Sequence, residues 1–146
     1  MTKRLLFVCL GNICRSPAAE GIMRGMCPGF EVESAGTANW HSGRPPYQPM
    51  IAAAALRGFD LSELRARQVT PGDFDRFDMI LAMDEQNLAD VEALRPDGNQ
   101  TPLHLLMQFA PQVETTVVPD PYYTRDFDQA LDLIEMAISG FCAQLQ

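Results

Sequence analysis

Runs of apolar residues predict the strands of this chain. Residues 5–8 (LLFV) contain no polar position, which is typical of a parallel strand that is buried on both faces. A second, largely apolar run spans residues 77–83, and a shorter one spans residues 103–107. Residues 30–35 alternate between apolar and polar positions, as a half-exposed strand does. We therefore expect about four strands.

The segments between and after these strands are predicted to form helices. Ser16 and Pro17 suit an N-cap and a first helical position, and the apolar residues that follow them recur at helical spacing. Further helices are predicted over residues 49–56, from residue 84 onward and over residues 128–145. Strands that alternate with helices imply an α/β fold, with a small open parallel sheet and helices on both faces. Ligands of such sheets bind beyond the carboxyl ends of the strands, which is where the first strand leads into Cys9.

The loop between the first strand and the first helix has the features of a phosphate site. Such a loop can turn successive backbone N–H groups inward at a helix N-terminus, and both features attract an anion. Arg15 adds a planar guanidinium that can bind two phosphate oxygens at once. The same dipoles and Arg15 favour the nucleophilic thiolate form of Cys9. We therefore expect phosphoryl transfer to Cys9, within a phosphate-binding loop made of Leu10, Gly11, Asn12, Ile13, Cys14, Arg15 and Ser16.

Two other interpretations of this loop compete with phosphoryl transfer. A lone cysteine at a strand end is often only a small buried hydrophobic residue. The spacing of Cys9, Arg15 and Ser16, directly after a strand and before a proline, is far more constrained and favours a catalytic role. A Walker-type nucleotide loop is excluded, because no Gly-Lys-Ser/Thr follows and the loop is too short.

Composition indicates the number of domains, the compartment and the state of the cysteines. The chain has 146 residues, 47% of them hydrophobic, which is enough for one domain with its own core over residues 1–146. No run approaches the roughly 20 apolar residues of a membrane span, and residues 1–9 lack the long apolar stretch of a signal peptide. We therefore expect a cytoplasmic chain. Its four cysteines have no zinc-like pairing and are expected to be reduced thiols, with Cys27 and Cys142 in structural roles only.

Charge and ligand spacing exclude other classes of partner. A formal net charge of −8 argues against nucleic acid, because binding a polyanion needs a basic face. The same charge predicts discrimination against strongly acidic peptides, while the loop still holds one phosphate. No metal site is expected, because His41 and His104 lie far apart with no Cys or Glu at ligand spacing. His41 is expected at the surface, and a monomer is favoured.

Residues 9–17 (CLGNICRSP) resemble the signature of the low-molecular-weight protein tyrosine phosphatases. The segments SAGT at 34–37, ARQ at 66–68, residues 77–85 and DPYY at 120–123 follow in the order and approximate spacing of that family. The resemblance therefore covers nearly the whole chain. It implies an enzyme that hydrolyses phosphotyrosine in proteins, and also aryl phosphates, through a phosphocysteine and without a metal or cofactor.

The resemblance also implies roles that the residues alone leave ambiguous. Asp120, otherwise most often a turn residue before proline, matches the general acid of the family, so the catalytic residues would be Cys9, Arg15 and Asp120. Cys14 would capture an oxidised Cys9 in a reversible disulfide, which would make the enzyme redox-regulated. The walls of the substrate cleft would be formed by Trp40, Tyr122 and Tyr123.

One departure from the family and two alternative functions stay open. Many members carry a histidine where this chain has Leu64, which puts the support of Asn12 in question. A thiol-dependent arsenate reductase of the same fold is one alternative, but it needs a further cysteine pair, and none lies between Cys27 and Cys142. A non-catalytic phosphotyrosine-binding module is the other, but it would be expected to lose Cys9 or Asp120.

Overall fold

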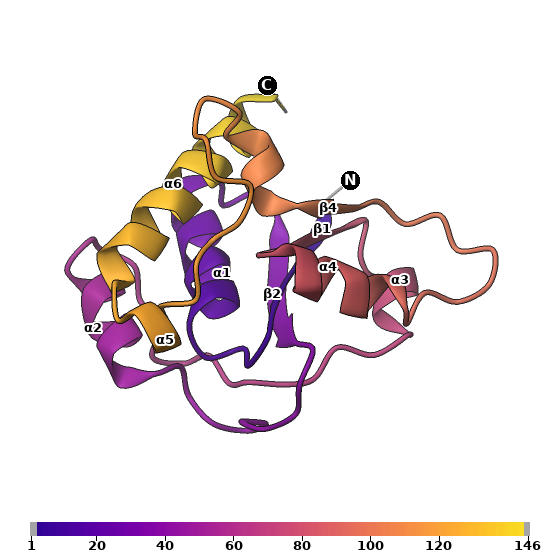
Figure 1. Cartoon of the computed structure of the whole chain (residues 1–146), viewed down its shortest axis with the longest axis horizontal. Helices are drawn as coiled ribbons and strands as arrows, with labels where there is room; N and C mark the ends of the chain where they lie inside the picture. The colour runs from indigo at the N-terminus through magenta and orange to yellow at the C-terminus, as the bar shows by residue number, and fades with distance from the viewer. Residues whose placement is uncertain (1–2, 145–146) are drawn as a thin grey trace.

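A four-stranded parallel sheet forms the centre of the computed structural model, which describes residues 3–144. The strand order is β2-β1-β3-β4, so the first strand lies inside the sheet with a neighbour on each side (Figure 1). The predicted α/β fold with about four parallel strands is confirmed. The strands are β1 (Arg4–Cys9), β2 (Glu31–Gly36), β3 (Met79–Ala82) and β4 (Leu103–Leu105).

Helices cover both faces of this sheet. Figure 1 shows α1 and α6 side by side on one face, and α3 and α4 on the other. Two short elements, η1 and α5, lie between β4 and α6 in the chain. The helical elements are α1 (Arg15–Met26), α2 (Gln48–Ala55), α3 (Asp73–Arg76), α4 (Glu85–Glu92), the 3₁₀ helix η1 (Leu106–Phe109), α5 (Pro121–Thr124) and α6 (Phe127–Gln144).

The continuous apolar run of β1 divides between two cores. Leu5 and Phe7 pack with residues of α1 and α6, whereas Leu6 and Val8 pack with residues of α3 and α4 on the opposite face. Successive side chains of a strand point to opposite faces, so a strand covered on both sides must be apolar throughout. Burying each such side chain contributes about 1.5–3 kcal/mol, which holds the end of β1, and Cys9 with it, in a fixed place.

Several predicted boundaries move in the structure. Helix α1 begins at Arg15 with Cys14 as its N-cap, so the prediction of Ser16 as N-cap is wrong. The Ser16 hydroxyl is engaged by Cys9 instead. The apolar run at 103–107 forms a strand only to Leu105, after which the chain turns into η1. The predicted helix over 128–145 corresponds to α6, and residue 145 lies outside the described residues.

The expectation of four reduced thiols is wrong for two of them. Cys27 and Cys142 form a disulfide, with their Cα atoms 6.6 Å apart. Cys27 directly follows α1, and Cys142 lies near the end of α6, the helix that packs beside α1. The two cysteines are 115 residues apart in sequence, so only the packing of the helices brings them together. Cys9 and Cys14 are free and buried.

None of the helices within residues 3–144 has the length and apolar character needed to cross a membrane.

Candidate active site

The loop after β1 is fixed to the end of β2 by backbone contacts. Cys9, the last residue of β1, pairs with Gly36, the last residue of β2. The N–H of Thr37 donates to the Cys9 carbonyl at 2.9 Å, and the N–H of Ala38 donates to the Leu10 carbonyl at 3.0 Å. A side chain at Gly36 would place its Cβ only 2.8 Å from the Leu10 carbonyl oxygen, so this close approach requires glycine.

The sulfur of Cys9 is surrounded by hydrogen-bond donors. The backbone N–H groups of Asn12 and Ser16 point to Sγ from 3.3 and 3.5 Å, and the Ser16 hydroxyl lies 3.0 Å from it. Such donors stabilise a thiolate, because they supply positive partial charge where the negative charge sits. The backbone N–H groups of Gly11, Ile13 and Cys14 donate to none of the residues from 3 to 144, so they can donate to a bound anion.

Asn12 holds the curvature of the loop. Its backbone has a φ of 57°, in the left-handed region that asparagine tolerates better than most residues. Its side chain fixes this conformation, because Oδ1 accepts from the Arg67 N–H at 3.0 Å while Nδ2 donates to the hydroxyls of Ser16 (2.8 Å) and Ser34 (3.0 Å). The departure at Leu64 therefore leaves Asn12 supported, and Leu64 packs against the core instead.

A buried carboxyl group extends this support below the loop. Glu20 accepts a hydrogen bond from the Ser34 hydroxyl at 2.7 Å and pairs with Arg24 at 2.6 Å. Burial raises the pKa of Glu20, and the contacts with Ser34 and Arg24 oppose that shift. Ser34 thus donates to Glu20 while it accepts from Asn12, which fixes the orientation of its hydroxyl.

Arg15 lies almost completely buried beside the loop, with 2% of its surface exposed. Its NH1 donates to Asp84 at 2.7 Å and to the Val118 carbonyl at 3.0 Å, and its NH2 reaches Asp120 at 3.3 Å. Burial alone would lower the pKa of Arg15, but attraction to Cys9, Asp84 and Asp120 outweighs it and raises the pKa. The Nε of Arg15 has no hydrogen-bond partner among residues 3–144, so one donor of the guanidinium remains for a ligand.

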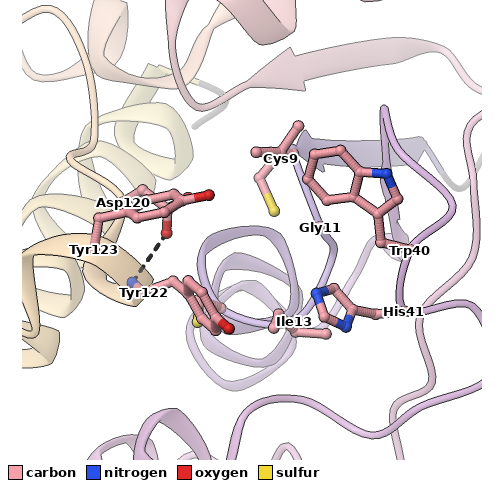
Figure 2. Close-up of a pocket in the computed structure, with 10 residues that line it drawn as sticks. Cys9, Gly11, Ile13, Trp40, His41, Asp120, Tyr122 and Tyr123 are labelled. Atoms are coloured by element: carbon pink, nitrogen blue, oxygen red, sulfur yellow. Dashed lines mark hydrogen bonds between the residues drawn. The ribbon is translucent and has the colours of Figure 1, made fainter.

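The loop forms the floor of a cleft with a volume of about 260 Å³. Figure 2 shows Asp120, Tyr122 and Tyr123 on one side of the cleft, Trp40 and His41 on the other, and the Cys9 sulfur between them. Asp120 is oriented by two contacts, because Oδ1 accepts from the Tyr122 N–H at 3.1 Å and Oδ2 from Arg15. The structure thus brings all three predicted catalytic residues and all three predicted aromatic residues to one place.

Residues 4–146 match the family described as low molecular weight phosphotyrosine protein phosphatase. The chain belongs to this family. It is 36% identical over 148 residues to the low molecular weight protein-tyrosine-phosphatase YfkJ of Bacillus subtilis, covering 97% of this chain and 95% of that relative. It is 40% identical over 138 residues to the low molecular weight phosphotyrosine protein phosphatase of Homo sapiens, covering 87% of this chain and 84% of that relative.

Solved structures agree with the assignment to low molecular weight phosphatases. The crystal structure of Bacillus subtilis YfkJ superimposes with a TM-score of 0.93 at 35% identity, covering 100% of this chain and 96% of that one. Vibrio vulnificus Wzb in complex with benzylphosphonate gives 0.88 at 27% identity and covers 99% of both chains. The predicted family, fold and class of enzyme, a protein tyrosine phosphatase, are confirmed.

Two residues of this phosphatase site escaped prediction. Asp84 was expected only to begin a helix; it does cap α4, but its Oδ2 also holds Arg15. Its position directly after β3, at the same edge of the sheet as Cys9, was a usable signal. His41 was expected at the surface, yet it lies partly buried in the cleft wall, close enough to Gly11 that a Cβ there would come 3.1 Å from its ring. No sequence pattern distinguished it.

Within residues 3–144 no group of three or more His, Cys, Asp or Glu side chains is arranged to hold a metal ion.

Proposed function

We propose that the chain hydrolyses phosphotyrosine in proteins through a phosphocysteine formed at Cys9. The observation that carries this proposal is the Cys9 sulfur, which sits at the floor of the cleft among backbone N–H groups and beside Arg15. In the first step the Cys9 thiolate attacks phosphorus, the S–P bond forms and the bond from phosphorus to the tyrosine oxygen breaks. Asp120 protonates that oxygen as it leaves, and Arg15 with the loop N–H groups stabilises the phosphoryl oxygens.

The second step regenerates the enzyme. Asp120, now a carboxylate, takes a proton from a water molecule whose oxygen attacks phosphorus. The S–P bond breaks, inorganic phosphate leaves, and Cys9 returns to the thiolate that Ser16 stabilises. The hydrogen bond from the Tyr122 N–H to Oδ1 supports this role, because it holds the carboxyl group of Asp120 in the mouth of the cleft.

The aromatic walls support a phosphorylated phenol as the group that enters. Trp40 and Tyr123 are 65% and 68% exposed, which leaves their faces available to stack on a substrate ring. Tyr122, 41% exposed, completes the opposite wall. The related Vibrio vulnificus Wzb was solved with benzylphosphonate, a benzyl group attached to a phosphonate, which supports the same class of ligand here.

Two alternatives are weaker. An arsenate reductase needs a further pair of thiols near the nucleophile; Cys14 lines the cleft, but Cys27 and Cys142 are joined to each other and neither lines it. A non-catalytic binding module has no need of a general acid, yet Asp120 is held by two hydrogen bonds beside Arg15 in the cleft wall.

Hydrolysis of p-nitrophenyl phosphate and of a phosphotyrosine peptide, in the presence of a chelator and with no added metal, tests the proposal directly. The reaction should proceed unimpaired. Acid quenching during turnover should leave a phosphate on the peptide that contains Cys9, detectable by mass spectrometry. Turnover that stops with chelator, or a phosphate found on another residue, would contradict the mechanism.

Asp120→Asn should slow the first step with phenol leaving groups by about 10² to 10⁴, the usual contribution of a general acid. Asparagine keeps the shape and can still accept from the Tyr122 N–H, but it cannot supply a proton. The loss should shrink as the leaving group becomes more acidic, because such groups depart without protonation. Rapid-quench rates across a series of substituted phenyl phosphates measure this dependence. Equal slowing of good and poor leaving groups would exclude Asp120 as the acid.

We further propose that the enzyme works as a cytoplasmic monomer. One chain supplies the nucleophile and the acid that line the cleft and the arginine that contacts that acid, which supports a monomer. The Cys27–Cys142 disulfide is more typical of oxidising compartments. Oxidation destroys the catalytic thiolate, and this supports a reducing compartment. Neither Cys27 nor Cys142 lines the cleft, so their disulfide is not part of the catalytic site.

Reversible inactivation through Cys14 is the regulatory part of the proposal. Peroxide would convert the Cys9 thiolate to a sulfenic acid, and the Cys14 thiol would displace water from it to form a disulfide. Burial, together with the charges of Cys9 and Asp120, raises the pKa of Cys14 to about 12. Cys14 therefore keeps its proton at neutral pH. Burial is the larger cause of this shift, and oxidation of Cys9 to the sulfenic acid removes the second, the negative charge at Cys9.

Mild peroxide should therefore inactivate the wild type in a way that a thiol reductant reverses. Mass spectrometry should show the loss of two hydrogens in the peptide that contains Cys9 and Cys14, distinct from the Cys27–Cys142 linkage. Cys14→Ser should regain a much smaller share of its own initial activity, because its sulfenic acid proceeds to irreversible acids. Equal recovery of the wild type and Cys14→Ser would rule out this protection.

A further inference from the structure

A groove adjoins the active-site cleft, and Ile13, His41 and Tyr122 line both cavities. Figure 2 shows these three side chains below the Cys9 sulfur, with Ile13 between Tyr122 and His41. The volume of the groove is about 270 Å³. A polypeptide whose phosphorylated side chain enters the cleft therefore meets a second cavity directly beside it. The other lining residues are Arg44, Pro45, Pro46, Tyr47 and Gln48.

The groove is built into the fold and is joined to the phosphate loop. The N–H of Tyr47 donates to the Ile13 carbonyl at 2.8 Å, and its ring packs against that of Tyr122 with 5.3 Å between centroids. The backbone at Arg44 is held on both sides, because its N–H donates to the His41 carbonyl at 2.9 Å and its carbonyl accepts from Ala66 at 2.8 Å. A cavity held in this way loses little conformational entropy when it binds a ligand.

Two arginines at this groove are not neutralised by carboxylates of the protein. Arg44 lines the groove, and Arg125 donates to the Tyr47 hydroxyl at 3.1 Å with its guanidinium 5.4 Å from the centre of the Tyr47 ring. Neither forms an ion pair with any carboxylate among residues 3–144, and no acidic residue is among the described residues that line the groove. In contrast, seven of the ten arginines pair with Asp or Glu: Arg4, Arg15, Arg24, Arg57, Arg67, Arg76 and Arg95.

We infer that this groove binds the segment of the substrate that flanks the phosphotyrosine, and that Arg44 and Arg125 select an acidic side chain in that segment. The inference rests on the proposed function, because the groove matters only when a phosphotyrosine occupies the cleft. The net charge of −8 predicts repulsion of acidic peptides by the surface as a whole. At physiological ionic strength, however, exposed charges more than about 8 Å away are largely screened, so the two nearby arginines dominate.

Two phosphotyrosine peptides that differ only in carrying Glu or Gln on both sides of the phosphotyrosine test the inference. The wild type should show a kcat/KM about 5-fold higher for the Glu peptide, the scale expected of exposed ion pairs. Arg44→Glu and Arg125→Glu should each abolish or reverse that ratio, and Arg44→Gln should give an intermediate value. The preference of the wild type should also fall as salt is raised.

Lys3→Glu is the matched control, because it changes the net charge by the same amount as Arg44→Glu or Arg125→Glu. Lys3 precedes β1, whereas Cys9 ends that strand, so the variant should keep the wild-type ratio. Activity toward p-nitrophenyl phosphate, which has no flanking residues, normalises every variant for folding. Failure of the wild type to hydrolyse that compound would overturn the proposed function. Hydrolysis of the two peptides with equal kcat/KM, or a ratio that neither arginine substitution changes, would overturn the inference that the groove selects an acidic side chain.

Discussion

Cys9→Ser is expected to abolish turnover, with a loss on the order of 10⁴ to 10⁶ in kcat. The N–H of Asn12 donates to Sγ and the Ser16 hydroxyl contacts it, and such contacts stabilise the thiolate that attacks phosphorus. A serine hydroxyl in the same place keeps its proton, because a hydroxyl is far less acidic than a thiol. Serine would also make the second step slow, since its oxygen is a poorer leaving group from phosphorus than sulfur is.

The fold should survive this exchange, because the hydroxyl is nearly isosteric with the thiol and can bond with the same donors. Thermal unfolding and near-UV circular dichroism measure that, and retained binding of a phosphotyrosine peptide shows that the site is intact. Cys142→Ser is the control for a cysteine replaced outside the cleft; it also breaks the Cys27–Cys142 disulfide, and it should retain turnover. Substantial hydrolysis by Cys9→Ser would falsify the phosphocysteine mechanism.

The parts of this site that lie close together in sequence could be predicted from it. Cys9, Arg15 and Ser16 belong to one loop between a strand and a helix, so the period of the apolar residues was sufficient to locate them. The parallel sheet with helices on both faces followed from the alternation of strands and helices, whereas its strand order, β2-β1-β3-β4, was not predicted. Some boundaries differed, as at Ser16, where a bond to Cys9 replaced a helix cap, and the short helices α3, η1 and α5 were not predicted.

The parts that depend on contacts between distant segments could not be predicted from local pattern. Asp120 reaches Arg15 across 105 residues, and only the resemblance to a family distinguished it from the other acidic residues. Asp84 lies 69 residues from the same arginine and was interpreted as a helix cap alone. The Cys27–Cys142 pairing depends on how α1 and α6 pack, which the spacing of cysteines does not encode. In each case the missing information is how segments that lie far apart in sequence pack against one another.

Arg15→Lys is expected to lower kcat/KM by about 10³, although it preserves the positive charge. Loss of one donor to a developing charge commonly costs about 10² to 10³, and lysine removes more than one. Arg15 uses NH1 for Asp84 and the Val118 carbonyl, and NH2 for Asp120, while Nε has no partner among residues 3–144. A lysine ammonium is a single point of charge and cannot hold these acids and two phosphoryl oxygens together.

Affinity for a phosphonate analogue should fall along with kcat/KM in Arg15→Lys, because the analogue needs the same guanidinium donors. Arg57→Lys is the matched control: Arg57 pairs with Asp128, Asp132 and Glu135 of α6, outside the cleft, and its exchange should leave turnover unchanged. The comparison separates the loss of the guanidinium geometry at the phosphate from the general effect of replacing a well-paired arginine. Wild-type kcat/KM in Arg15→Lys would contradict the bidentate role of Arg15, because a charge without that geometry would then be enough.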